Sequence, residues 1–278
     1  MGQPDAWLQR HAGRRRPAHP ATASGPRPMT DALKSDAHVV TLTSAERERK
    51  WPNVRPKDAA TLILLDRQGP SPKVLMGRRH PGHKFMPGKF VFPGGRIEAG
   101  DRRMAAAGAL DAKVEERLMA RVQRATQGRA RALALAAIRE TYEETGLLLG
   151  TTDHGAPDEA PEGVWSEFAA HGVFPTLENL HFIARAITPP RRPKRFDTRF
   201  FAAEAADIAH KVEGVVGPDS ELVELVWVEL EEAQRLDLPT ITGVILKELQ
   251  TRLDGGLAPW MPVPFYYEVQ GKFRRDEL

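Results

Sequence analysis

The stretch ALALAAIRETYEETGLLLG, residues 132–150, places three acidic side chains on one side of a predicted helix. At about 100° per residue these side chains fall within an arc of roughly 100°, and apolar side chains occupy the opposite side. The acidic residues are Glu140, Glu143 and Glu144, and the apolar ones are Leu135, Ile138 and Tyr142. We expect the helix to begin near Ala132 and to end at Gly146, because glycine is the usual left-handed residue after a helix C-terminus.

The three clustered carboxylates need a partner, because like charges repel. Carboxylates about 6 Å apart repel by about 3 kcal/mol per pair at an effective dielectric constant of about 20. A favourable exposed ion pair on a helix returns only about 0.2 to 0.5 kcal/mol, so Arg139 offsets only part of this repulsion. Two interpretations remain: a solvated acidic face whose side chains spread apart, or a divalent cation held between the carboxylates. Hard oxygen ligands without cysteine or histidine favour Mg²⁺ or Mn²⁺, ions that normally act with phosphate.

The composition indicates a globular protein without a membrane partner. The chain has 278 residues, 41% of them hydrophobic, and we expect a single domain at 38–278 after a disordered or extended leader at 1–37. Forty basic against 37 acidic residues leave a net charge of only +3, so nucleic acid is not expected as a partner. The absence of cysteine excludes disulfides and thiol nucleophiles. Because the sequence shows neither a membrane-spanning run nor the apolar segment of a secretory signal, we expect a cytoplasmic location.

Strand-like and helical patterns alternate along the chain, which predicts an α/β fold. The strand-like runs are 59–66, 73–79, 89–92, 181–188, 195–205 and 221–230, and the first two are expected to form a hairpin. Helical patterns occupy 164–172, 240–253 and the Ala- and Arg-rich segment 102–131. In that last segment a stripe is expected to pack on the body of the protein, formed by Val114, Leu118 and Val122. Strands on both sides of a central helix predict a mixed sheet between helical layers, an α/β/α sandwich.

A second informative stretch, FVFPGGRIEAGD at 90–101, leads a short apolar run into a double glycine. Without side chains, these glycines allow the backbone to approach a ligand or a metal closely. The two stretches together resemble the signature of the Nudix hydrolase family: Gly, five residues, Glu, seven residues, then Arg-Glu-apolar-any-Glu-Glu-any-Gly-apolar. Here Gly95 and five further residues lead to Asp101, and the second half runs from Arg139 to Leu147.

The chain departs from this signature at three points. Asp101 stands where the family has Glu, and Thr141 stands where it has an apolar residue. In addition, the 37 residues 102–138 occupy a space that normally holds seven. The resemblance therefore implies a Nudix-type α/β/α sandwich with a helical insertion, at about 102–131, inside the Nudix box.

The resemblance also implies a metal-dependent hydrolase that cleaves a nucleoside diphosphate linked to another moiety. The implied ligands of Mg²⁺ or Mn²⁺ are the carbonyl of Gly95 and the carboxylates of Glu140, Glu143 and Glu144. Arg139 would orient a glutamate through a salt bridge, and Gly94 and Arg96 are expected next to the substrate.

The general base is not fixed by the box, because family members take it either from the box helix or from a later loop. Glu221 and Glu224, just ahead of the VWVEL run, are the candidates for a base or a further ligand. Ordinary exposed charges at a strand edge are the alternative interpretation of both residues.

A split box is similar to that of the coenzyme A diphosphatases that carry an insertion at the same place. The run ITPPRRPKRFDTRFFAAE at 187–204 also resembles their segment after the box. Since coenzyme A carries a 3′-phosphate besides its diphosphate, its site should supply extra cations. Two clusters qualify, RRHPGHK at 78–84 and RRPKR at 191–195, although each could be a solvated basic loop. The expected substrate-binding residues are Arg78, Arg79, Lys84, Arg192 and Arg195.

Several alternatives stay open at this point. The substrate could be ADP-ribose or a dinucleotide of the NADH type rather than coenzyme A or an acyl-coenzyme A. Two other classes of protein are also possible interpretations: a binding module that has lost catalysis, and an RNA-end processing enzyme. Trp165 and Phe168 could stack on an adenine, although core packing is the simpler interpretation. The resemblance also implies a homodimer, for which no apolar stripe identifies an interface.

Overall fold

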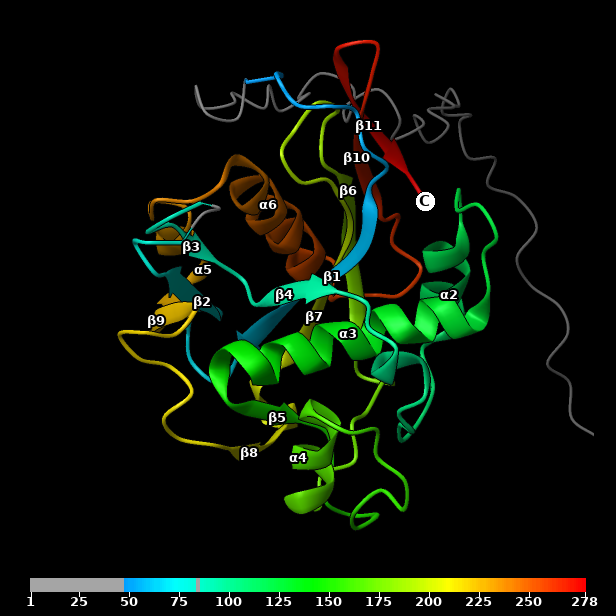
Figure 1. Cartoon of the computed structure of the whole chain (residues 1–278), viewed down its shortest axis with the longest axis vertical. Helices are drawn as coiled ribbons and strands as arrows, with labels where there is room; N and C mark the ends of the chain where they lie inside the picture. The colour runs from blue at the N-terminus through cyan, green and yellow to red at the C-terminus, as the bar shows by residue number, and fades with distance from the viewer. Residues whose placement is uncertain (1–47, 84–85) are drawn as a thin grey trace, which may run out of the picture. The chain divides into compact units, whose positions relative to one another are not determined.

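A mixed β-sheet carries the double glycine and supports the acidic helix (Figure 1). A computed structural model describes residues 48–83 and 86–278, so the expected leader at 1–37 lies outside the described residues. Within these residues, nine strands pair in the order β11-β10-β6-β7-β1-β2-β3, with β4 beside β1 and β9 beside β2. β1 is parallel to β7 and β10 is parallel to β6, whereas the other pairs are antiparallel.

The boundaries of the elements follow the apolar runs of the sequence. The main sheet contains β1 (Lys57–Asp66), β2 (Lys73–Arg79), β3 (Phe90–Val91), β4 (Gly94–Arg96), β6 (His181–Ile187), β7 (Phe196–Glu204), β9 (Leu222–Glu229), β10 (Pro264–Val269) and β11 (Lys272–Glu277). A small second sheet pairs β5 (Leu147–Leu149) with β8 (Ile208–Lys211). The helices are η2 (Gly100–Arg102), α2 (Ala112–Met119), α3 (Gln127–Thr145), α4 (Val164–Ala170), η3 (Ala205–Asp207), α5 (Leu230–Ala233) and α6 (Thr240–Asp254). The expected hairpin is confirmed, because β1 and β2 pair antiparallel.

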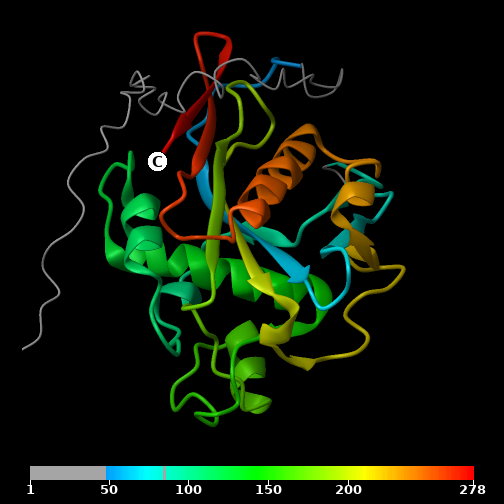
Figure 2. The same ribbon diagram turned by 180° about the vertical axis from the view of Figure 1, so that it is seen from behind.

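Helices α3 and α6 cover opposite faces of the main sheet. Figure 1 shows α3 across the near face, and the reverse view in Figure 2 brings α6 to the front. The alternation of β1 explains this arrangement, because successive side chains of a strand point to opposite faces. Leu62 and Leu64 belong to the cluster that contains α3, whereas Ile63 and Leu65 belong to the cluster that contains α6. The predicted sandwich of a mixed sheet between helical layers is therefore confirmed.

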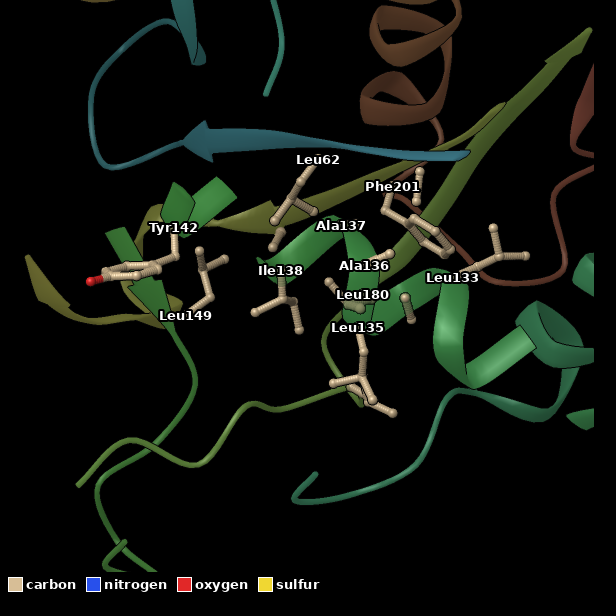
Figure 3. Close-up of a cluster of buried hydrophobic side chains, with 14 of the residues drawn as sticks. Leu62, Leu133, Leu135, Ala136, Ala137, Ile138, Tyr142, Leu149, Leu180 and Phe201 are labelled. Atoms are coloured by element: carbon tan, nitrogen blue, oxygen red, sulfur yellow. The ribbon is translucent and has the colours of Figure 1, made fainter. Parts of the chain in front are cut away.

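The middle of α3 lies very close to the sheet because alanines face it. Ala136 and Ala137 are fully buried and pack near Leu62 and Phe201, as the close-up in Figure 3 shows. Helix α3 ends where the sequence predicted, since Gly146 adopts φ 76° and donates its N–H to the carbonyl of Tyr142 at 2.8 Å. This packing fixes the position of the acidic residues in the last two turns of the helix.

The segment 102–131 is not one helix, so that prediction is wrong. It begins as the short η2, continues without regular structure, forms α2, and joins α3, which begins at Gln127 and not near Ala132. Two capping side chains explain the restarts. Asp111 accepts hydrogen bonds from the N–H groups of Lys113 and Val114, and the Thr126 hydroxyl accepts one from Arg129. Such side chains favour a helix start over a helix interior.

The segment is nevertheless an integral part of the core. Met104, Val114 and Leu118 are buried, which confirms the packing expected for the first two residues of the stripe, while Val122 lies beyond α2. Polar contacts add to this packing on the side of β10 and β11. Arg117 donates to the carbonyls of Pro259 and Trp260, and Arg121 pairs with Asp276 and donates to the Tyr267 hydroxyl.

Three parts of the fold were not predicted: β4, the β5–β8 sheet and the β10–β11 hairpin. The sequence Gly-Gly-Arg of β4 has no strand pattern, and its pairing with β1 is a tertiary effect. In the described part of the chain, no helix has the length and apolar character needed to cross a membrane.

Candidate active site

The three glutamates of α3 lie in different environments although they belong to the same two turns. The Glu143 side chain is 35% exposed and that of Glu140 is 16% exposed, whereas Glu144 is buried. Helix geometry turns Glu144 inward, because it follows Glu143 by 100° toward the sheet. The acidic group therefore extends from the surface into the interior of the protein.

The double glycine lies directly against this acidic group, as expected from the sequence. A Cβ atom on Gly95 would fall 2.3 Å from the carboxyl carbon of Glu140, so a side chain there would have to displace this carboxylate. A Cβ atom on Gly94 would fall 2.6 Å from the carbonyl oxygen of Ala60 on β1. The backbone contact requires glycine at Gly94, whereas at Gly95 the lack of a side chain lets the backbone lie next to the Glu140 carboxylate.

Glu144 is a buried carboxylate with an unsatisfied oxygen. Its Oε2 atom has no hydrogen-bond partner among the described residues. Burial raises the pKa of Glu144 well above its usual value, and the nearby charge of Glu221 raises it further, while Arg79 and the N–H of Gly94 lower it. A buried acceptor without a donor is costly, so the position favours a ligand that supplies positive charge.

The other two glutamates are shifted in the same direction. Burial, followed by the repulsion of Glu143, raises the pKa of Glu140 to about 7 although Arg139 opposes the shift. Burial and the neighbouring Glu98 also raise the pKa of Glu143. The protein alone therefore disfavours the ionised form of all three carboxylates, a pattern typical of functional sites.

Arg139 ties the acidic helix to the loop after β4. The buried guanidinium donates to Asp101 Oδ1 at 2.8 Å, to the carbonyl of Arg96 at 2.7 Å and to Glu143 Oε2 at 2.5 Å. It also lies 3.1 Å from Glu140 Oε1. The salt bridge expected from Arg139 to a glutamate is thus present.

Asp101 has a role that the sequence did not reveal. It is fully buried, binds Arg139 through both oxygens, and accepts a hydrogen bond from the Trp165 indole at 3.2 Å. Its position in the signature was noted, but its partner lies 38 residues away along the chain. The aspartate therefore holds the arginine that holds the glutamates.

The two base candidates occupy different positions relative to Glu144. Glu221 lies close enough to raise the Glu144 pKa, and its Oε1 is 3.1 Å from Arg79 Nη1. Glu224 instead pairs with Arg78 at 2.8 Å across the β2–β9 ladder, with both side chains exposed. The structure brings Glu221 to the acidic group, and it places Glu224 in an exposed ion pair.

Of the two basic clusters expected at the substrate, the one at 191–195 is engaged elsewhere, whereas Arg79 of the other lies beside Glu221 and Glu144. Arg192 is buried and donates to the carbonyl of Glu48, and Arg195 donates to Asn53 Oδ1 and to the carbonyl of Val54. These arginines therefore hold the segment that precedes β1. Lys84 lies outside the described residues.

Trp165 and Phe168 pack in the core and do not form an exposed stacking surface. Both are buried, and their rings lie 4.9 Å apart within the cluster that contains α3. The simpler interpretation from the sequence is confirmed.

A hard divalent cation fits the donor set, although the glutamates are not arranged as a finished coordination sphere. Within the described residues, no group of three His, Cys, Asp or Glu side chains has metal-binding geometry. The contacts of Arg139 explain this, because they hold Glu140 and Glu143 toward the guanidinium. The unsatisfied Oε2 of Glu144 and the side-chain-free backbone of Gly95 nevertheless match the oxygen ligands that Mg²⁺ and Mn²⁺ prefer.

Comparison with solved structures identifies the fold. The chain is similar to a Nudix hydrolase from Alicyclobacillus acidocaldarius, with 27% identity and a TM-score of 0.53, over 70% of this chain and 90% of that one. A MutT protein from Methanosarcina mazei Go1 is more distant, with 14% identity and a TM-score of 0.40 over 74% and 98% of the two chains. No protein-family model and no curated protein matches the chain. The chain thus has the fold of the Nudix hydrolases.

Proposed function

We propose that the protein is a divalent-metal-dependent hydrolase that cleaves the diphosphate bond of a nucleoside diphosphate linked to another moiety. One observation carries this proposal: three glutamates with raised pKa values lie together, and one of them, Glu140, packs directly against Gly95 of the double glycine. A solvated acidic face does not explain the buried Glu144, since its Oε2 has no donor among the described residues. The divalent cation that accompanies a bound diphosphate would supply the missing positive charge.

The proposed ligands are Glu140, Glu143, Glu144 and the carbonyl of Gly95. A bound Mg²⁺ or Mn²⁺ ion would neutralise the phosphate oxygens and lower the pKa of a coordinated water. In this scheme Arg139 positions Glu140 and Glu143, because its guanidinium contacts both carboxylates and is itself fixed by the buried pair with Asp101.

Glu221 is the proposed general base. Its carboxylate lies near Glu144 and is held by Arg79, so it can accept a proton from water at the same site. Glu224 is the weaker candidate because it pairs with Arg78, whereas Glu221 lies close enough to Glu144 to raise its pKa. Glu221→Gln should therefore reduce kcat strongly at unchanged KM, and Glu224→Gln should change kcat little; the reverse result would exchange the two assignments.

Coenzyme A or an acyl-coenzyme A is the proposed substrate, and the products would be 3′,5′-ADP and the corresponding phosphopantetheine. The split box and the segment 187–204 support this choice through their resemblance to the coenzyme A diphosphatases. ADP-ribose and NADH-type dinucleotides are the alternative substrates, since they contain the same diphosphate without the 3′-phosphate.

The decisive experiment is incubation of the purified protein with Mg²⁺ or Mn²⁺ and a set of diphosphates, with products identified by mass. The set contains coenzyme A, an acyl-coenzyme A, ADP-ribose and NADH. Glu232→Gln, an exposed acid on α5, serves as a matched control for Glu144→Gln. Cleavage that survives in Glu144→Gln would refute the metal assignment. If the wild-type protein cleaves no member of the set with either ion, a non-catalytic binding module with the same fold becomes the better explanation.

A further inference from the structure

Four cationic side chains beside the candidate site have no acidic partner in the part of the chain that the structure describes. Lys57, Arg96, Arg102 and Arg103 are exposed, and none of their side chains takes part in an ion pair or a hydrogen bond there. They differ in this respect from Arg78, which pairs with Glu224. Unpaired cations gathered at one place repel one another, so the group needs an anion to be stabilised.

These side chains line one open hollow of about 820 Å³. Its lining is completed by Asp58, Ile97, Glu98 and Ala99. The Asp58 carboxylate is already bound by Arg129 at 2.7 Å and by Arg199 at 3.0 Å. Among the lining residues only Glu98 remains as an unpaired acid, so the hollow has a clear positive excess. Its volume is in the range of small-molecule sites, about 300 to 1,000 Å³.

The hollow adjoins the acidic site along β4 and the loop that follows it. Gly95 lies under Glu140, and the carbonyl of the next residue, Arg96, accepts a hydrogen bond from Arg139. Glu98 is close enough to Glu143 to raise its pKa. A nucleotide whose diphosphate lies at the glutamates could therefore extend along this loop into the basic hollow.

We propose that this hollow binds a phosphate monoester of the substrate, separate from the diphosphate that is cleaved. This inference rests on the proposed function. The phosphate monoester would be the part of the substrate that determines specificity. Guanidinium groups bind phosphate through paired hydrogen bonds, and Arg102 and Arg103 offer two such groups at the start of the segment inserted in the box. The inserted segment thus supplies two of the four cations. All four are distinct from the cations of the two basic clusters at 78–84 and 191–195.

Isothermal titration calorimetry of the full chain in Mg²⁺ tests this inference with 3′,5′-ADP and 5′-AMP, which differ by one phosphate monoester. The wild-type protein should bind 3′,5′-ADP at least about tenfold more tightly. The double variant Arg102→Gln/Arg103→Gln should bring the two affinities within about twofold of each other. Raising KCl from about 0.05 M to about 0.3 M should narrow the wild-type preference, because the cations are exposed.

A matched control removes two exposed cations on the other face of the sheet. Arg235→Gln/Lys247→Gln, near α5 and on α6, should keep the full preference for 3′,5′-ADP. Lys57→Gln provides an independent test in case the double variant fails to fold, and it should lower the preference by several fold. Equal affinities in the wild-type protein, or a preference that survives in both Lys57→Gln and the double variant, would overturn the inference.

The calorimetric result is separate from turnover. A wild-type protein that cleaves ADP-ribose as well as coenzyme A and shows no preference for 3′,5′-ADP would refute the phosphate site and leave the hydrolase intact. A protein that prefers 3′,5′-ADP but cleaves no diphosphate would refute the hydrolase, with the phosphate site standing on the binding data alone.

Discussion

Glu144 on α3 and Glu248 on α6 are two buried glutamates on opposite faces of one sheet. Their exposures are nearly equal, 7% for Glu144 and 8% for Glu248. Glu248 accepts a hydrogen bond from the Tyr266 hydroxyl, and its Oε1 lies 3.0 Å from Arg275 Nε. Glu144 has an oxygen without any donor among the described residues, and its pKa is raised mainly by burial.

The contrast is between a carboxylate with a structural role and one that we propose as a metal ligand. At Glu248 the neighbouring side chains compensate the loss of hydration, so the charge stabilises the contact between α6 and the β10–β11 hairpin. At Glu144 no described side chain compensates the loss of hydration of Oε2, which is why we propose a bound cation there. Two equally buried glutamates should therefore differ in their effect on stability. Substitution of Glu248 should lower the free energy of unfolding, whereas substitution of Glu144 should not lower it.

The largest effect is expected for Glu144→Gln, measured as kcat with Mg²⁺. Loss of one ligand charge should lower kcat by at least about 10³-fold. In metal-free protein at pH 8 the same variant should unfold at a temperature equal to or above that of the wild type, because a desolvated charge is removed. A metal-free variant with a clearly lower Tm would show that Glu144 is structural and would remove the contrast with Glu248.

The next effect is the loss of stability expected for Glu248→Gln, measured by urea denaturation. The amide cannot replace the charge beside Arg275, so the free energy of unfolding should fall by about 3 kcal/mol. At a temperature where the variant stays folded, kcat should remain within about twofold of wild type. A selective loss of kcat without a loss of stability would contradict the structural role.

Metal addition at two pH values gives an intermediate effect. The carboxyl pKa values of Glu140 and Glu144 are raised in the folded state, so both groups make the metal-free protein less stable as the pH rises. For Glu140 this loss develops as the pH rises from 4.5 through about 7. Bound Mg²⁺ should reverse this loss, with a gain of about 2.7 kcal/mol at a hundredfold excess over Kd. The rise in Tm on adding Mg²⁺ should be larger at pH 8 than at pH 5.5, and Glu144→Gln should reduce it. An equal rise at both pH values would indicate that the ion binds elsewhere.

The smallest effect is expected at the other end of the same helix. Thr126→Ala removes the N-terminal cap of α3 and should lower the free energy of unfolding by about 1 kcal/mol. The acidic residues lie in the last turns, so kcat should be unchanged below the unfolding transition. Circular dichroism melting and turnover under the same conditions give both values. A large loss of kcat would show that the glutamates depend on the whole helix and not on their local contacts.

Much of the site could be predicted because its information is local. The acidic arc, the double glycine and the cap at Gly146 depend on the spacing of a few residues within one strand or helix. The hairpin and the late helix were also predictable, since the apolar periodicities are clear. The sequence therefore predicted correctly that the double glycine, Arg139 and the glutamates lie together. Their roles stay predictions.

The remaining features depend on contacts between distant residues. The pairing of Asp101 with Arg139 follows from the path of the chain after β4, which no local pattern encodes. The same path leaves Arg102 and Arg103 without an acidic partner among the described residues. The inserted segment was misread as one helix because alanine and arginine favour helices, whereas the caps at Asp111 and Thr126 break it. Arg192 and Arg195 looked free in the sequence because their partners lie more than a hundred residues earlier.

The contacts of the inserted segment also bear on how fast the protein reaches its native state. Arg117 and Arg121 bind partners 142 to 155 residues further along the chain, in and just before the β10–β11 hairpin. Contacts of such long sequence separation slow folding, because a large loop must close before they form. The two halves of the box, themselves separated by this segment, should therefore come together late. During refolding, activity should return after most of the secondary structure has formed. Arg121→Ala should mainly accelerate unfolding, which tryptophan fluorescence can follow.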